Sequence, residues 1–212
     1  MMYSFLRSST LAVALFFLCI QVVVAQSALP TEEQQIMAAV SAAPESLQAE
    51  ATVLGYQTAS DSTLSVLRKG TNKLICIADD PKSTDFHVAC YHQDLEPFMK
   101  RGRQLKAKGM SRKEIDLIRR SEIRSGKIPM PERAMALYAL SGPDDAVDYE
   151  ERAIDDVSPL YVVYLPNATA ESTGLPLRPF SKGAPWLMEP GTPWAHIMIS
   201  TGEKVNKKVP AP

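Results

Sequence analysis

The residues of this 212-residue chain best suited to chemistry are its three histidines, His87, His92 and His196. An imidazole exchanges protons near neutral pH and also ligates metals, so each is a candidate base or ligand. His196 follows the only two tryptophans, Trp186 and Trp194. Aromatic walls around one titratable group are typical of small-molecule sites, so we predict a ligand-binding cleft at Trp186, Trp194 and His196. The alternative is a histidine that is simply hydrogen-bonded within a sheet.

His196 is also the one weak candidate for catalysis. As a general base it would need a carboxylate partner such as Glu171 or Glu189, which would make the protein a hydrolase-type enzyme. The sequence contains no Gly-x-Ser-x-Gly, His-Glu-x-x-His or Cys-x-x-Cys motif and no phosphate-binding glycine loop. We therefore assign no catalytic residue and no cofactor, and whether the protein is an enzyme stays open.

A metal site is the second chemistry that the histidines suggest. His87 and His92 lie near several carboxylates, and imidazole with carboxylate is a common ligand combination. Residues five apart on one strand point to opposite faces, so both are weak candidates and we predict no metal site. The carboxylates near them are Asp79, Asp80, Asp85 and Asp94. The run Asp79-Asp80-Pro81 is itself predicted to be a turn.

The N-terminus has the pattern of a secretory signal peptide. Arg7 precedes an uninterrupted apolar run at residues 11–20, and Ala25 supplies a small residue at the expected cleavage point. The run is shorter than the roughly 20 residues that span a bilayer, so residues 1–25 are predicted to be removed rather than kept as an anchor. We therefore expect a secreted or periplasmic protein whose mature chain has no transmembrane anchor.

Export bears directly on the cysteines. Cys76 and Cys90 are the only cysteines beyond the predicted cleavage point, and thiols oxidise in exported proteins. We predict a disulfide between them, which would close a loop of about 15 residues and contribute about 3 kcal/mol. Two buried free thiols are the alternative.

Charge divides this nearly neutral chain into two opposite segments. Residues 100–127 carry eleven Lys and Arg against three acidic residues, whereas residues 144–156 are mainly acidic. The two segments could neutralise each other in the fold or simply coat the surface. A surface for polyanions is a further alternative, but nucleic acid is not an expected partner, because aromatic residues are not interleaved with the basic ones.

Periodicity and turn residues predict both helices and strands. Helices are expected at residues 31–50, with a break near Pro44, and at residues 94–109 and 111–126, which would form a hairpin. The run at residues 160–165 has no polar alternation, which predicts a central strand covered on both faces. Strands are expected at residues 52–56, 63–67, 74–78, 86–91, 135–140, 160–165, 186–188 and 195–199.

These elements together predict an α+β fold. We expect a mostly antiparallel sheet with an N-terminal helix and an inserted two-helix hairpin, stapled by one disulfide. A single globular domain is expected over residues 26–201, because no linker or repeat interrupts that stretch. The Lys-rich segment 202–212 is expected to be a flexible tail.

Several short segments together resemble a family of uncharacterised exported proteins, mostly bacterial. The family has a Trp where this chain has Leu74 or a neighbouring residue, so the likeness is incomplete. The resemblance implies export to the periplasm, a loop with paired cysteines and no assigned reaction. The segments that carry it read LRKGTN at residues 67–72, with Cys76, Asp79 and Pro81 behind it, ATAESTGL at 168–175, PWLM at 185–188, GTP at 191–193 and HIMI at 196–199.

We therefore expect an exported, non-catalytic module that binds a small ligand or an envelope protein. The alternative is a secreted hydrolase-type enzyme that uses His196 with a nearby carboxylate. The ligand and the oligomeric state stay open at this level. If the source is a eukaryote, Asn167 begins an Asn-Ala-Thr sequon and would be a glycosylation site.

Overall fold

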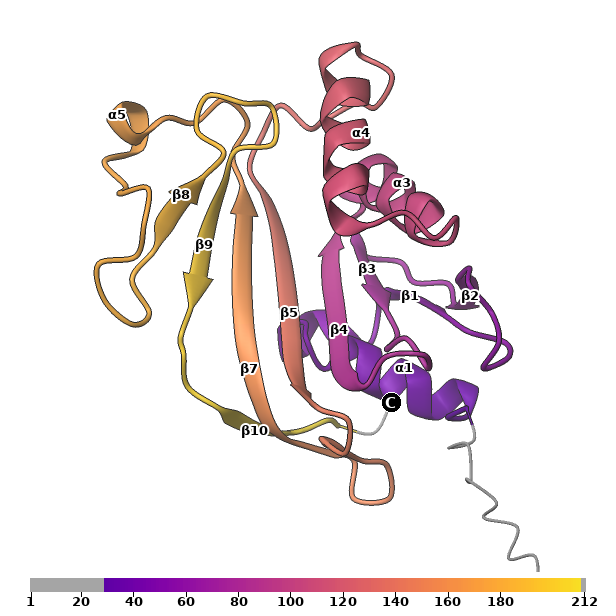
Figure 1. Cartoon of the computed structure of the whole chain (residues 1–212). Coiled ribbons are helices and arrows are strands. Elements are labelled where there is room, and N and C mark those ends of the chain that lie inside the picture. Colours follow the sequence, from indigo (N-terminus) through magenta and orange to yellow (C-terminus); the bar gives the residue numbers. More distant parts are fainter. Residues whose placement is uncertain (1–28, 211–212) are drawn as a thin grey trace, which may run out of the picture.

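The computed structural model describes residues 29–210 and shows an α+β fold built on one large mixed sheet (Figure 1). The predicted signal peptide, residues 1–25, lies outside the described residues. No helix within the described range is long and apolar enough to cross a membrane. The helices are α1 (Glu32–Val40), α2 (Glu45–Gln48), the 3₁₀ turn η1 (Gln93–Leu95), α3 (Glu96–Lys106), α4 (Arg112–Arg124) and α5 (Ala170–Thr173). The strands are β1 (Thr52–Gly55), β2 (Ser65–Arg68), β3 (Leu74–Ile77), β4 (Asp85–His92), β5 (Met135–Pro143), β6 (Val147–Asp148), β7 (Ala153–Tyr164), β8 (Trp186–Met188), β9 (His196–Ser200) and β10 (Val205–Lys208).

The sheet follows the order β2-β1-β3-β4-β5-β7-β9-β8, and β6 and β10 pair with β7 outside this path. All neighbouring strands are antiparallel except β1 and β3, which run parallel. Many strand residues are β-branched or aromatic, the types that pack well on a pleated surface. The sheet is therefore mostly antiparallel, with one parallel pair that the sequence did not indicate.

A disulfide joins two neighbouring strands of this sheet. Cys76 on β3 lies directly opposite Cys90 on β4, and the two sulfurs are bonded at 2.04 Å. Both residues are fully buried. The predicted pairing of Cys76 with Cys90 is confirmed, and it fixes the register of the hairpin formed by β3 and β4.

Helix α1 covers one face of β1, β3 and β4 (Figure 1). Thr31 caps the helix, because its hydroxyl accepts from the Gln34 N–H while the Gln34 side chain accepts from the Thr31 N–H. The buried side of the helix consists mainly of alanines and Met37. These small side chains let the helix pack closely on Val53 and Val88 of the sheet.

Helices α3 and α4 form a hairpin on the opposite face of the sheet (Figure 1). Ser111 and Glu114 cap α4 with reciprocal hydrogen bonds, and Gly109 supplies a positive φ of 77° in the connecting turn. Arg101 of α3 donates to both carboxylate oxygens of Glu122 on α4, at 2.7 and 2.6 Å. This hydrogen bonding lowers the pKa of Glu122 to about 2, so the carboxylate stays charged and joins the two helices.

Strand β7 lies inside the sheet, between β5 and β9. The prediction that residues 160–165 are covered on both faces is wrong. Val162 is buried on one face, but Tyr161 on the other face is 37% exposed. Tyr161 instead packs edge-on against Tyr138 across the strands, with ring centroids 6.3 Å apart. The apolar run therefore reflects a central place in the sheet, with full cover on only one side.

The prediction of a flexible tail at residues 202–212 is wrong for the part that the structure describes. Strand β10 pairs with β7, and the Lys207 ammonium donates to the Ser41 carbonyl oxygen. The Val209 side chain is 5% exposed and belongs to the core beneath α1, with Val205 packed beside it. The folded domain therefore extends past its predicted end, because Val205 and Val209 of this Lys-rich segment pack on the core.

Replacing Val209 with alanine tests whether the C-terminal segment belongs to the core. Removing two buried methyl groups should lower the free energy of unfolding by about 1–2 kcal/mol. Val66→Ala is the matched control, because Val66 is 61% exposed on β2 and its truncation should cost less than about 0.5 kcal/mol. Urea denaturation followed by circular dichroism measures both. Equal stability of the two variants would mean that Val209 is not packed.

Candidate functional site

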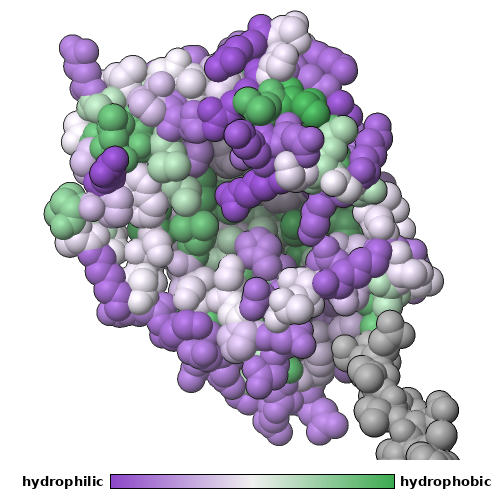
Figure 2. All heavy atoms as spheres, viewed as in Figure 1, coloured by the Kyte–Doolittle hydropathy of each residue, from purple (hydrophilic) through white to green (hydrophobic). Residues whose placement is uncertain are grey.

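The face of the sheet beneath the α3–α4 hairpin is only partly covered. Ile77, Ala89, Ala139 and Leu160 lie side by side on this face, across β3, β4, β5 and β7. Figure 2 shows a hollow in the middle of the face, with hydrophobic side chains on its floor and hydrophilic ones around it. Two cavities open on this side of the sheet, one beside α3 and one beside α4.

The larger cavity, which we call the Asp79 cleft, has a volume of about 760 Å³. The C-terminal end of α3, the turn between β3 and β4 and the loop between β1 and β2 enclose it. Its size lies within the range of small-molecule sites, which are largely apolar with a few convergent polar groups. The apolar part of the lining includes Leu64, Ile77, Ala78 and Ala107, and the polar part includes Tyr56, Asp79 and His87.

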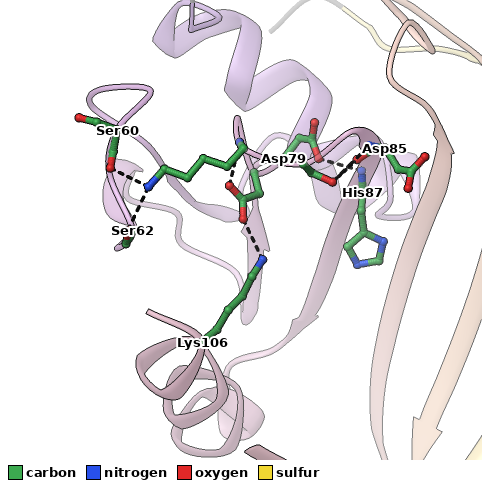
Figure 3. A network of polar contacts seen from close by, with 9 residues as sticks. Ser60, Ser62, Asp79, Asp85, His87 and Lys106 are labelled. Carbon is green, nitrogen blue, oxygen red and sulfur yellow. Dashed lines mark hydrogen bonds and ion pairs between the residues drawn. The ribbon is translucent and has the colours of Figure 1, made fainter. Parts of the chain in front are cut away.

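Two lysines tie the sides of the Asp79 cleft together (Figure 3). Lys82 in the β3–β4 turn donates to the Ser60 carbonyl oxygen at 2.7 Å and to the Ser62 hydroxyl at 3.0 Å. Lys106 at the end of α3 donates to a carboxylate oxygen of Asp80 at 2.8 Å. Both lysines are exposed, so each contact adds little to stability. The charge of Lys106 is balanced by Asp80, whereas Lys82 donates to uncharged oxygens of the loop.

Asp79 is a strongly perturbed carboxyl of this cleft. Its Oδ1 accepts a hydrogen bond from the His87 backbone N–H at 2.8 Å. Burial raises the pKa of Asp79 to about 6, and the charges of Asp144 and Asp80 act in the same direction. Burial also raises the pKa of Tyr56 to about 12, so its phenol stays protonated. The cleft therefore offers the phenol of Tyr56 as a donor and, at Asp79, a carboxyl that changes its protonation state near neutral pH.

The His87 side chain does not form an acid–base pair with Asp79. Its Nδ1 lies 2.9 Å from the Ser141 hydroxyl oxygen, and in Figure 3 the ring points away from the Asp79 carboxyl. Partial removal from water, together with the positive charge of Lys106, lowers the pKa of His87. The ring is therefore a neutral hydrogen-bonding group at physiological pH.

His92 lies on the same strand as His87, and the two side chains fall on opposite faces of the sheet. His92 Nδ1 accepts a hydrogen bond from the Asp94 N–H at 3.2 Å and so caps the turn η1. Within residues 29–210, no group of three His, Cys, Asp or Glu side chains is arranged to hold a metal ion. The role of His92 seen in the structure is a local cap.

The smaller cavity, which we call the Trp194 pocket, has a volume of about 260 Å³. It lies between α4 and the strands β8 and β9, and both Trp194 and His196 line it. The structure thus brings together two of the three residues that we expected to form a cleft. Trp186 pairs with Met198 on the same face of the sheet but does not line the pocket.

His196 is held in the wall of this pocket by two contacts. Its Nδ1 lies 2.8 Å from the Trp194 carbonyl oxygen, and its ring packs on Tyr164 with centroids 5.2 Å apart. A carbonyl oxygen only accepts hydrogen bonds, so Nδ1 carries a proton and donates to it. This geometry matches the alternative expectation, in which His196 is simply hydrogen-bonded within a sheet.

The carboxylates considered as partners of His196 are placed elsewhere. Glu189 lines the pocket, but both of its oxygens accept hydrogen bonds from Arg120. Glu171 is exposed on α5 and does not line the pocket. The described residues that line the pocket include no Ser, Thr or Cys. The other carboxylate of the lining, Asp116, accepts from Arg119, and the lining hydroxyl is the phenol of Tyr164, whose pKa burial raises to about 12.

The basic segment at residues 100–127 forms no ion pair with the acidic segment at residues 144–156 in the described part of the chain. The acidic segment pairs instead with the C-terminal strand, through Glu151 with Lys208 and Asp156 with Lys204. The expectation that the basic and acidic segments neutralise each other through ion pairs is therefore wrong for the described residues. The carboxylates that pair with the basic segment are Asp80, Glu96, Asp116, Glu122 and Glu189.

Sequence reasoning missed the Asp79 cleft. It predicts a turn at Asp79-Asp80-Pro81, which is where the chain reverses between β3 and β4, but a turn gives no sign of burial. Burial of Asp79 arises because α3 and the loop between β1 and β2 fold against that turn from distant positions. The signal that could have indicated the cleft is the position of Asp79, which directly follows Ala78 and a buried strand. A carboxyl at such a position is costly to desolvate.

Comparisons with protein families, with characterised proteins and with solved structures give no match for this chain. Neither a relative nor a known fold therefore assigns a role to either cavity. The function has to be argued from the residues that line them.

Replacing Asp79 with asparagine tests the burial of its carboxyl. Because its folded pKa of about 6 lies above the ordinary value of 3.8, the folded state binds the proton more tightly than the unfolded state does. The stability from this group is therefore present below pH 4 and is lost as the pH rises from about 4 to about 6. Partial exposure limits the loss to about 1 kcal/mol.

Because an asparagine side chain cannot ionise, Asp79→Asn should lack this loss and should be more stable than the wild type above about pH 6. Urea unfolding at several pH values between about 4 and 7 measures the difference. Asp85→Asn is the control, because Asp85 is an exposed carboxylate on the same hairpin. If Asp79→Asn and the wild type share one pH profile, the Asp79 carboxyl is as hydrated in the folded chain as in the unfolded one.

Proposed function

We propose that this protein is an exported, non-catalytic module that binds a small organic ligand in the Asp79 cleft. The observation that carries the proposal is the cleft itself, a cavity of about 760 Å³ with an apolar wall and a perturbed carboxyl. An apolar cavity with few convergent polar groups and a shifted pKa is the usual form of a ligand site.

The contacts of the basic residues around the cleft disfavour an anionic ligand. Lys106 is paired with Asp80, and Lys82 donates to the loop between β1 and β2. Arg103 donates to Glu96 and to the Tyr91 hydroxyl. An anionic ligand would have to break one of these contacts to gain its own. A mainly apolar ligand with one polar end meets the apolar wall and the carboxyl of Asp79 without that cost.

Export to the periplasm or the outside of the cell is part of the same proposal. The apolar N-terminal run with Ala25 at a cleavage point supports it, and so does the disulfide between Cys76 and Cys90. The resemblance to uncharacterised exported proteins, carried by the LRKGTN segment and the C-terminal HIMI segment, agrees with this compartment. An envelope protein as the partner is the second binding role that the sequence leaves open.

Filling the cleft tests its role directly. Nile red, a neutral apolar dye, should bind the oxidised protein with a saturable rise in fluorescence. Ala107→Trp places a large side chain at the cleft wall and should weaken this binding by about tenfold or more, a loss of about 1.4 kcal/mol. Ala170→Trp adds the same side chain at an exposed position of α5 and should leave the affinity unchanged.

Circular dichroism of both variants controls for folding. Equal Nile red affinity in the two tryptophan variants would contradict the proposal, because the dye would then bind outside the Asp79 cleft. The same conclusion would follow if the folded wild type gave no saturable signal.

A further inference from the structure

We infer that the Trp194 pocket is a second binding site, built for a small aromatic carboxylate, and that Glu189 occupies its carboxylate position in the unliganded protein. The pocket is separate from the Asp79 cleft and differs from it in charge and in shape. The inference rests on its arginines, on the contact that Glu189 makes and on its aromatic walls. None of these belongs to the function proposed above.

Three arginines of α4 line the pocket, against two carboxylates. Arg119 donates to Asp116 at 2.8 Å, and Arg120 is paired with Glu189. Arg112 has no carboxylate within 4.0 Å among the described residues. The wall is therefore positively charged, and the planar fork of a guanidinium matches the two oxygens of a carboxylate.

Glu189 shows where a carboxylate sits in this pocket. Arg120 Nη1 donates to one Glu189 oxygen at 2.9 Å, and Arg120 Nη2 donates to the other. Glu189 has φ of 54°, in the left-handed region that a residue with a side chain rarely adopts, and it stands directly before Pro190. Thr192 holds this turn by donating its hydroxyl to the Glu189 carbonyl oxygen at 2.7 Å. The chain thus accepts a strained backbone at the residue that binds Arg120.

The remaining walls suit one flat ring. Phe98, Tyr164 and Trp194 line the pocket, and the Arg119 guanidinium lies 4.0 Å from the centre of the Phe98 ring. A volume of about 260 Å³ is large enough for a single substituted aromatic ring. Aromatic rings pack well on such faces and on guanidinium planes.

Two of the lining residues carry a buried N–H group without a partner among residues 29–210. The buried nitrogens Trp194 Nε1 and Arg119 Nε have no hydrogen-bond partner within the described chain, and both groups can only donate. A carboxylate only accepts hydrogen bonds, so it matches the guanidinium donors of the arginines that line the pocket. A neutral amide of the same shape would bring two further donors and would meet the arginines unfavourably.

The probe for this site is 4-nitrobenzoate, whose nitro group quenches tryptophan fluorescence. Trp186→Phe leaves Trp194 as the only tryptophan of the chain, so quenching in this background reports on the pocket alone. We expect saturable quenching by 4-nitrobenzoate and at least tenfold weaker binding of 4-nitrobenzamide, the neutral analogue. Equal binding of the two compounds, or no quenching of Trp194, would overturn the inference.

Replacing Glu189 with glutamine distinguishes this inference from a generic anion effect. The substitution removes the internal carboxylate that competes for Arg120, so Glu189→Gln should bind 4-nitrobenzoate about tenfold more tightly. Glu132→Gln, which removes an exposed carboxylate outside the pocket, should change the affinity little. Unchanged or weaker binding by folded Glu189→Gln would show that Glu189 does not occupy the ligand position.

A second pair of variants keeps the test open if Glu189→Gln fails to fold. Arg112→Gln should weaken 4-nitrobenzoate binding several-fold, because Arg112 lines the pocket without a carboxylate partner. Lys113→Gln removes the neighbouring charge, which is exposed and does not line the pocket, and should have little effect. Equal losses of 4-nitrobenzoate affinity in both variants would mean that the basic residues attract anions in general, and would contradict a specific site at the arginines.

Discussion

Water has to be excluded from two faces of one large sheet, and the rest of the structure follows from how the chain does this. Helix α1 and the C-terminal strand close one face over the disulfide between Cys76 and Cys90. On this side the cover is apolar and close, with small side chains on the helix and Val209 in the core. The disulfide inside this layer fixes β3 relative to β4. It therefore also fixes the opposite face of these strands, on which α3 and α4 lie.

The opposite face is covered in a different way, and both cavities result from that difference. The α3–α4 hairpin is rich in charge and is held by ion pairs, of which Arg101 with Glu122 joins its two helices. Such a hairpin buries few apolar side chains, so it covers only part of the face and leaves one cavity beside α3 and another beside α4. The cleft beside α3 is apolar with paired charges, and the pocket beside α4 has aromatic walls and arginines. One covering element thereby gives the sheet two sites of different chemistry.

Local features of the fold could be read from the sequence, because they depend on residues close together in the chain. Cys76 and Cys90 flank a turn at similar distances, which allows the pairing that the structure shows. The capping residues of α4, Ser111 and Glu114, also act within one turn of the chain. The parallel pairing of β1 with β3 and the place of β10 could not be read, because both depend on contacts between distant segments. The Asp79 cleft was missed for the same reason. Trp194 and His196 could be predicted to lie in one pocket because they are close together in the sequence, and both line the Trp194 pocket.

The central claim, that the partly covered face binds small molecules, is tested most directly by native mass spectrometry of the protein exported by its own N-terminus and purified without reductant. The denaturing spectrum should give the mass of a chain that begins at Gln26 and lacks two hydrogens, as the disulfide requires. The native spectrum should carry an additional, non-covalent mass of an organic ligand that disappears on denaturation. A native spectrum that shows only the bare chain would contradict the claim and would favour a role in contacts with an envelope protein.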